Sequence, residues 1–253
     1  PGTTEDGVER QKLMITAIIE KRDRVSAEDV RGIWVRDIKP ESAGKVSEPF
    51  EADLLAMAKT PIPARDLGRY CDYSGLVSFA RSCHPIGLIN AGDPEAAMSD
   101  VFEVGQLYQT ANSRGLQWAS VTAVAIAAGT KPGATVDSVI GTVFGLCGKL
   151  DKRFYRGGNV VREIEAGLKM TARCSDFREM RKAFDQKYSG SGIPYAQSYA
   201  NEVVTKAICV FRMVKGDPKD AIIASVNMGR DTDCLASIAG GISGAFSGGA
   251  SLP

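Results

Sequence analysis

Apolar residues recur along this chain at helical spacing and not in alternation. The clearest stripe lies within residues 136–144, where apolar side chains fall at i, i+3, i+4, i+7 and i+8. Because no stretch alternates with period two, the pattern predicts an all-α fold without a sheet. The helices expected on these grounds cover about residues 8–20, 98–108, 118–129, 136–144, 203–214 and 235–248.

Helix-boundary signals agree with this pattern. Ser26 and Asp29 form a capping-box variant ahead of a short helix. The triplets Gly92-Asp93-Pro94 and Gly216-Asp217-Pro218 each indicate a boundary between two helices. In both, Gly can end the first helix, Asp can cap the second, and Pro fits the first turn of the second. Surface loops rich in Pro, Gly and Ser are expected at residues 39–49, 59–74 and 189–194.

The last expected helix, residues 235–248, carries an apolar stripe flanked by several glycines. An internal Gly costs roughly 1 kcal/mol of helix propensity relative to Ala, which is tolerable where neighbouring helices approach closely. We therefore expect this helix at the centre of the domain. The alternative is a Gly-rich, loosely ordered C-terminus.

Composition narrows the class of protein. With 253 residues, 44% of them hydrophobic, the chain can form one domain over residues 1–253. A net charge of +1 with interleaved signs argues against nucleic acid, and no apolar run approaches the roughly 20 residues that span a membrane. We expect a soluble cytoplasmic protein. Six cysteines without a CxxC pair favour buried thiols, with a disulfide framework as the alternative: Cys71, Cys83, Cys147, Cys174, Cys209 and Cys234.

Two acidic clusters, each directly before a helix, are the candidates for chemistry. One contains Asp231 and Asp233, and the other contains Glu5 and Asp6 behind Thr4. Helix capping alone could explain Asp231 and Asp233. If the two helix entrances meet in space, however, four carboxylates converge and remain ionised only with cations between them. Mg²⁺ or Mn²⁺ fits such oxygen ligands best.

Three segments resemble the signatures of one enzyme family. Residues 227–239, NMGRDTDCLASIA, are similar to the N-x-G-G-D-T-D-T-hydrophobic-A-x-I-A motif of ADP-ribosylglycohydrolases. Residues 4–7 resemble the family's T-D-D-T, and residues 81–95 its R-x-A-P-I-G-L and A-G-D-P-E segment. The resemblance implies an orthogonal multi-helix domain with a central metal cleft, in which one or two Mg²⁺ (or Mn²⁺) ions are held beside the scissile ribosyl C1″ bond.

Site residues follow from the resemblance, position by position. It implies that Glu5 or Asp6 is the catalytic base. Its metal ligands would be Thr4, Glu5, Asp6, Asp231 and Asp233, with Cys234 at a further ligand position. The substrate wall would be formed by Tyr73, Ser74, Gly75, Thr110, Asn112, Ser113, Gly115 and Arg230.

Several positions depart from the family pattern. Cys234 stands where the family has a hydroxyl ligand, Glu5 where it has Asp, and Arg230 where it has Gly; Arg230 could pair with a carboxylate or bind a substrate phosphate. The lone histidine, His84, is interpreted as structural. The family's N-terminal segment is also expected to be absent, either trimmed or supplied by another chain.

These features leave three functional hypotheses. The first is metal-dependent hydrolysis of an ADP-ribosylated protein or small molecule. The second keeps the metal cleft but changes the substrate to another phosphorylated or ribosylated metabolite. The third is a non-catalytic descendant that binds metal or nucleotide.

Overall fold

The computed structural model describes residues 6–39, 49–153, 160–190, 192–193 and 195–251. Among them no strand is present, and the only β pairing is an isolated antiparallel bridge between Leu76 and Tyr199. The all-α prediction is therefore confirmed. The α-helices are α1 (Asp6–Lys21), α2 (Ala27–Asp37), α3 (Pro49–Ala58), α4 (His84–Ile89), α5 (Pro94–Val104), α6 (Arg114–Gly129), α7 (Val136–Arg153), α8 (Val160–Thr171), α9 (Phe177–Lys187), α10 (Ala200–Met213), α11 (Pro218–Val226) and α12 (Thr232–Ser247). Short 3-10 helices are η1 (Ala64–Tyr70), η2 (Gly105–Leu107), η3 (Ala196–Ser198) and η4 (Gly249–Ser251).

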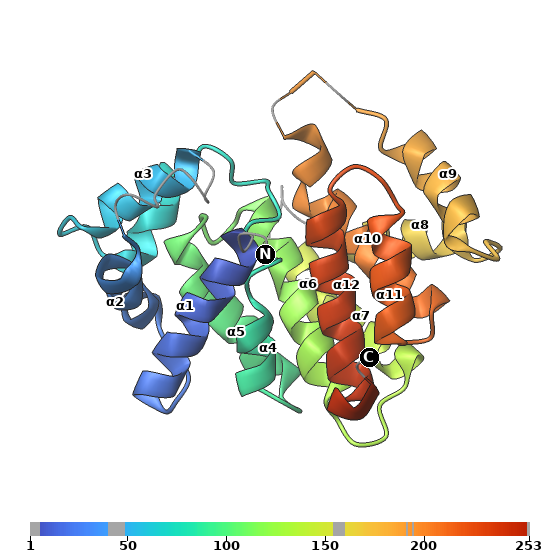
Figure 1. Cartoon of the computed structure of the whole chain (residues 1–253), viewed down its shortest axis with the longest axis horizontal. Helices are drawn as coiled ribbons and strands as arrows, with labels where there is room; N and C mark the ends of the chain where they lie inside the picture. The colour runs from blue at the N-terminus through green and yellow to red at the C-terminus, as the bar shows by residue number, and fades with distance from the viewer. Residues whose placement is uncertain (1–5, 40–48, 154–159, 191, 194, 252–253) are drawn as a thin grey trace.

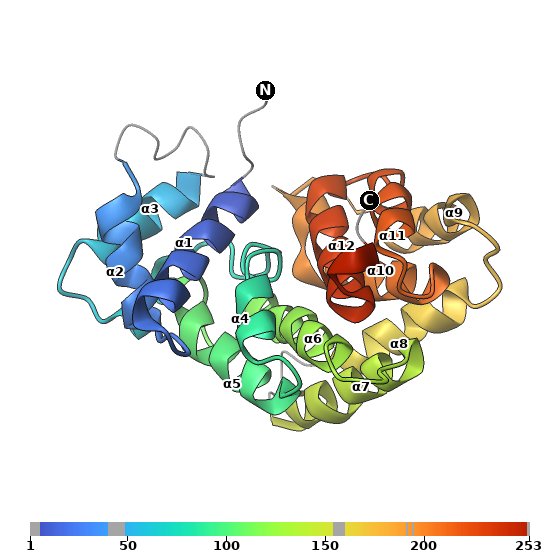
Figure 2. The same ribbon diagram turned by 60° about the horizontal axis from the view of Figure 1, so that its bottom comes forward.

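The helices are arranged around α6. In Figure 1, α1, α2 and α3 lie on one side of the molecule and α8 to α12 on the other, with α4, α5 and α6 between them. Helix α6 packs against α4, α5, α7, α10 and α12. Figure 2 shows α4 and α6 joining the two sides from below. The buried apolar residues of both sides belong to one continuous cluster.

Helix α6, and not α12, occupies the centre of the molecule. All residues of α6 from Gly115 to Gly129 are buried, because its side chains are small or apolar on every face. Helix α12 buries only the stripe that contains Leu235 and Ile238, and its glycine-bearing face is half-buried. The expected close approach is nevertheless present: a Cβ at Gly241 would lie 2.2 Å from Cδ2 of His84 on α4.

The expected helix caps are confirmed. Ser26 and Asp29 form a complete capping box at the start of α2. Asp93 and Asp217 accept hydrogen bonds from the backbone N–H of Ala96 and Asp220, and each is followed by a proline in the first turn.

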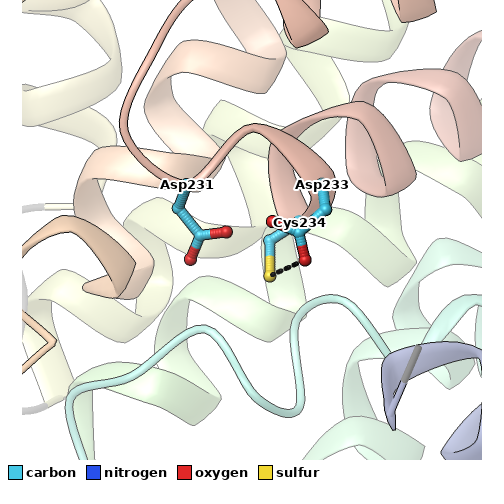
Figure 3. Close-up of side chains that lie close together, drawn as sticks. All are labelled: Asp231, Asp233 and Cys234. Carbon is cyan, nitrogen blue, oxygen red and sulfur yellow. Dashed lines mark hydrogen bonds between the residues drawn. The ribbon is translucent and has the colours of Figure 1, made fainter.

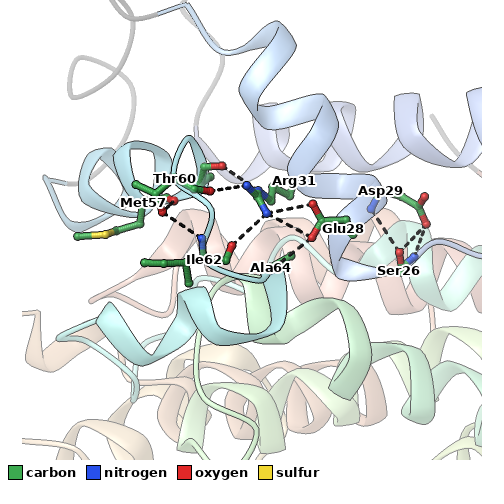
Figure 4. Close-up of polar contacts among 9 residues, drawn as sticks. Ser26, Glu28, Asp29, Arg31, Met57, Thr60, Ile62 and Ala64 are labelled. Carbon is green, nitrogen blue, oxygen red and sulfur yellow. Dashed lines mark hydrogen bonds and ion pairs between the residues drawn. The ribbon is translucent and has the colours of Figure 1, made fainter.

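The segment 59–74, expected as an open loop, is partly helical and is fastened to α2. Its centre forms η1. The Arg31 guanidinium donates to three backbone carbonyls, with Nε 2.8 Å from Ala58 O, Nη2 2.6 Å from Thr60 O and Nη1 3.0 Å from Ile62 O. Figure 4 shows Arg31 beside Thr60 and Ile62. Because these carbonyls precede η1, a single side chain positions the chain ahead of it.

All six cysteines are thiols, and five of them are buried, as the composition predicts. Within the described part of the chain, no helix has the length and apolar character needed to cross a membrane.

Candidate metal centre

Asp231, Asp233 and Cys234 converge at the first turn of α12. One potential ligand atom from each residue lies within 4.8 Å of the others. Figure 3 shows the three side chains pointing to the same side of the helix entrance. Two carboxylates at this separation form the kind of oxygen-rich corner that a hard divalent cation binds.

The turn ahead of α12 positions the two carboxylates at the helix entrance. Gly229 and Arg230 both adopt left-handed backbone conformations, with φ of 72° and 65°, so the chain reverses sharply between α11 and α12. Asp231 then occupies the N-cap position, but its side chain makes no capping hydrogen bond. The capping alternative therefore does not account for the orientation of Asp231.

Burial and a neighbouring carboxylate both act on the charge of Asp231. Burial raises the pKa of Asp231 above its ordinary value, and the nearby Asp233 raises it as well. Hydrogen bonds with the side chains of Ser198 and Cys234 oppose this shift. A divalent ion between the carboxylates would remove the repulsion that disfavours the charged form of Asp231.

Cys234 differs chemically from the two carboxylates. Burial raises the pKa of its thiol far above the ordinary range, and Asp231 and Asp233 add to that shift. The thiol therefore stays protonated, with Sγ 3.4 Å from Nη1 of the buried Arg81. A neutral thiol is a poor ligand for a hard cation, so Asp231 and Asp233 are the better donors.

The first acidic cluster lies mostly outside the described residues. Thr4 and Glu5 are not described; Asp6 begins α1, but its side chain is outside the description as well. One contact relates α1 to the candidate site: Gln11 Nε2 donates to the carbonyl oxygen of Arg81 at 2.7 Å, and Arg81 reaches Cys234. Asp6 precedes Gln11 by five residues, about 7.5 Å along a helix.

The predicted substrate-wall residues meet near this site in part. The carbonyl oxygen of Ser74 accepts from Gly115 N at 2.9 Å, and that of Gly75 accepts from Ala200 N at 3.0 Å. A Cβ at Gly75 would lie 2.7 Å from the Tyr199 ring, so only glycine permits this approach. The turn 73–75 is thus fixed to the starts of α6 and α10.

Other members of that predicted wall have local structural tasks. Ser113 caps α6 by accepting from Leu116 N at 3.1 Å. The backbone oxygen of Thr110 accepts from Ser113 N, and that of Asn112 accepts from the Gln117 side chain. Their role toward a substrate stays a prediction.

Arg230 pairs with a buried carboxylate. Its Nε and Nη2 lie 2.6 and 3.0 Å from the two oxygens of Glu202. Lys206 Nζ lies 2.7 Å from the same carboxylate, and the side chains of Glu202 and Lys206 are only 4% and 2% exposed. Two roles were expected for Arg230, and the structure contains the first of them, an ion pair with a carboxylate. Binding of a substrate phosphate stays a prediction.

His84 is buried between α4 and α12. Its Nε2 lies 3.0 Å from the carbonyl oxygen of Ser237, which can only accept, so Nε2 carries the proton. Burial lowers the pKa of His84 to about 4, which makes the ring neutral at physiological pH. These contacts agree with its interpretation as a structural residue.

Sequence reasoning missed several neighbours of Asp231. A small cavity of about 30 Å³ beside it is lined by Ser78, Arg81, Tyr195 and Ser198, among others. Arg81 belongs to a segment used for the family resemblance, so that segment could have suggested its role. Tyr195 immediately precedes the 3-10 helix η3 and Ser198 ends it. No motif marks either residue, and only the fold brings them to α12.

Comparison with known proteins gives a family. A search of the curated proteins finds no match for this chain. A family model described as ADP-ribosylglycohydrolase matches residues 1–253. Since the match extends over the whole chain, the protein belongs to the ADP-ribosylglycohydrolase family.

Proposed function

We propose that this protein is a metal-dependent glycohydrolase that cleaves the ribosyl C1″ glycosidic bond of an ADP-ribosylated protein or small molecule. Family membership supports glycohydrolase activity on ADP-ribosylated substrates. The observation that carries the metal requirement is the pair of Asp231 and Asp233, whose oxygens converge without a capping role for Asp231.

The donor set fits Mg²⁺ or Mn²⁺ better than a soft metal. Asp231 and Asp233 offer hard carboxylate oxygens, whereas the Cys234 thiol is held protonated. Zinc would call for imidazole or thiolate ligands, and the only histidine, His84, is occupied with Ser237. We therefore assign Asp231 and Asp233 as ligands, together with Thr4, Glu5 and Asp6 from the first cluster, for one or two ions.

The protein's own residues would perform the remaining tasks. Asp231 and Asp233 would hold a divalent ion, which would supply positive charge to polarise a water and to orient the ribose hydroxyls. The Ser198 side chain would help to hold the Asp231 carboxylate in its charged form, because its interaction lowers the pKa of that group. Arg81 Nη1 lies 3.4 Å from Cys234 Sγ, and this Sγ lies 3.8 Å from Oδ2 of Asp233. Glu5 or Asp6 would accept the proton from the attacking water, as a general base must.

The test compares aspartates that share a structural position but differ in the proposed role. Asp231→Ala and Asp233→Ala should each lower Mg²⁺-dependent release of free ADP-ribose by at least about 100-fold, since each removes a ligand. Asp217→Ala is the matched control, because Asp217 is also a helix N-cap but lies outside the cluster. It should cost roughly 1 kcal/mol of stability and leave turnover unchanged. Absence of turnover by the intact protein on Arg-, Ser- and O-acetyl-linked substrates would contradict the proposal.

A second candidate is action on a different phosphorylated or ribosylated metabolite. It is favoured by the altered surroundings of the acidic pair, where Arg230 is drawn toward Glu202 and a thiol stands at position 234. Thermal-shift measurements with Mg²⁺ separate the two candidates. Stabilisation by a ligand that lacks ADP-ribose, and none by ADP-ribose, would favour the second.

A further inference from the structure

A cavity of about 220 Å³ lies among α8, α9 and α10. Helix α8 packs against both of the others, and Figure 1 shows the three on one side of the molecule. None of the described residues that line the cavity belongs to the candidate metal centre or to the predicted substrate wall. On α10, Cys209 lines the cavity and follows Glu202 by seven residues, about 10 Å along a helix. The cavity is therefore distinct from the site at the entrance of α12.

Sulfur-bearing side chains are concentrated at this cavity. Nine described residues line it, and four of them are Cys174, Met180, Cys209 and Met213. The whole chain has only six cysteines and seven methionines among its 253 residues. Random placement would put far fewer than four sulfur atoms at nine positions, so composition alone does not explain the cluster.

The four sulfur-bearing residues come from three segments of the fold. Cys174 lies in the turn between α8 and α9, and Met180 lies on α9. Cys209 and Met213 lie on α10, four residues apart, so they share one face of that helix. Helix α8 closes the back of the cavity, because a Cβ at Gly167 would lie only 3.2 Å from Sγ of Cys209. Only the tertiary fold brings these side chains to one place.

Core packing accounts for this arrangement only in part. Cysteine and methionine often fill hydrophobic cores, and Met180 and Cys209 are buried. Cys174 and Met213, however, are half-buried, and the exposed Arg212 also lines the cavity. A close-packed core would also leave no such space between its side chains. The cavity thus has a buried inner wall and a rim through which a small ion can enter.

The two thiols lie near enough to influence each other. Burial raises the pKa of Cys209 to about 12, and Cys174 adds to this shift, whereas Arg212 opposes it. Burial also raises the pKa of Cys174. Both thiols are therefore neutral without an ion. Arg212 would offset the negative charge that remains if two thiolates bind one monovalent cation.

We propose that this cavity binds one Cu⁺ ion through the thiolates of Cys174 and Cys209, with the thioethers of Met180 and Met213 as further ligands. Thiolate and thioether sulfurs are soft donors that suit Cu⁺, and the flexible methionine side chains can turn toward it. Each thiol releases its proton to solvent as its Cu–S bond forms, and copper stays in the +1 state. No histidine or carboxylate is among the described lining residues, so harder ions lack ligands there. The site does not depend on the proposed hydrolysis.

The test measures Cu⁺ affinity of the full chain, without oxygen, in competition with a chromogenic Cu⁺ chelator. Wild-type protein should bind one Cu⁺. Cys209→Ala should weaken binding by at least about 100-fold and Met213→Leu by about tenfold, since each removes a ligand. Met170→Leu is the matched control, because Met170 is also half-buried but lies on α8 and does not line the cavity. It should leave the affinity unchanged.

Thermal unfolding of each variant checks folding. Met213→Leu decides the test if Cys209→Ala does not fold, because exchange of Met for Leu conserves volume. Three results would overturn the inference: no Cu⁺ uptake by wild-type protein, equal weakening by Met170→Leu and Met213→Leu, or wild-type affinity in both Cys209→Ala and Met213→Leu. The last would mean that the half-exposed thiol of Cys174 binds the ion alone. Zn²⁺ binding as tight as Cu⁺ would overturn the assignment to a soft monovalent ion.

Discussion

Two charged clusters meet at the entrance of α12 and are built in opposite ways. In the first, Glu202 lies between Lys206 and Arg230, so its charge is compensated within the fold. In the second, Asp231 and Asp233 face each other with a neutral thiol between them and the cation Arg81. Consecutive residues, 230 and 231, thus belong to a compensated cluster and to one that, among the described residues, has no ion pair, here called the uncompensated cluster.

The difference separates stability from ligand binding. The Glu202 carboxylate is already neutralised by its two cations and needs no ligand. Removing the carboxylate or one cation would leave a buried charge without a partner, which destabilises the fold. A pair of close carboxylates without a cation raises the free energy of the folded state, and a divalent ion relieves that cost. The first cluster should therefore govern folding, and the second should govern the response to metal.

The largest effect is expected from Glu202→Gln. The amide keeps the shape of the side chain but leaves Lys206 and Arg230 without a negative partner, so the free energy of unfolding should fall by about 3–5 kcal/mol. Denaturant unfolding measures it. Glu95→Gln, at an exposed ion pair with Lys149, is the control and should change stability by less than about 1 kcal/mol. Equal effects of the two substitutions would remove the distinction between the clusters.

A smaller loss of stability is expected when the pH is lowered, because of the buried side chain of His84. His84 has a pKa of about 4 in the folded state against an ordinary value of 6.5. Above pH 6.5 the ring is neutral in both states, so it adds no pH dependence. Between pH 6.5 and about 4 the unfolded chain binds a proton that the folded protein excludes. Stability should therefore fall by roughly 2–3 kcal/mol over this window and level off below it.

The contribution of His84 is measured by difference. Wild-type protein and His84→Gln are unfolded in denaturant at several pH values, and the gap between their free energies of unfolding is plotted. The gap should shrink as the pH falls from 6.5 to 4, because only the wild type has a histidine at position 84 whose protonation favours the unfolded chain. A gap that is constant with pH would show that the ring is protonated equally in both states.

The smallest effect concerns the uncompensated cluster. Cys234→Thr replaces a protonated thiol by a hydroxyl oxygen, which is a harder donor for Mg²⁺. We expect Mg²⁺ affinity, measured by calorimetry, to rise by about tenfold, with little change in stability without metal. Cys209→Thr has no such oxygen to offer at the site, because Cys209 is buried in α10, and should leave affinity unchanged. Unchanged affinity in Cys234→Thr would mean that position 234 does not contact the ion.

Much of the fold could be read from the sequence because its signals are local. The Ser26 capping box and the Asp93 and Asp217 caps need only neighbouring residues, and the apolar stripes need only a helical period. The choice of central helix was harder. Glycines in α12 suggested close packing, but α6 is the helix that is buried on every face, which depends on its five neighbours.

The candidate site also has one part that local sequence predicts and another part that depends on the tertiary fold. Asp231 and Asp233 are two residues apart, so their convergence follows from one helix entrance. Arg81 and Ser198 reach Asp231 and Cys234 from distant segments, and no local pattern marks Ser198. The pairing of Arg230 with Glu202 likewise joins positions 28 residues apart, which only the tertiary fold determines.

Burial of the thiols has a practical consequence for spectroscopy. Cys174, in the turn between α8 and α9, is the one cysteine that is half-exposed. Burial and the nearby Glu179 raise the pKa of Cys174, but the other five thiols are buried, so a maleimide dye should attach to Cys174 first in the native protein. The wild-type chain thus carries a ready position for a single fluorescent reporter.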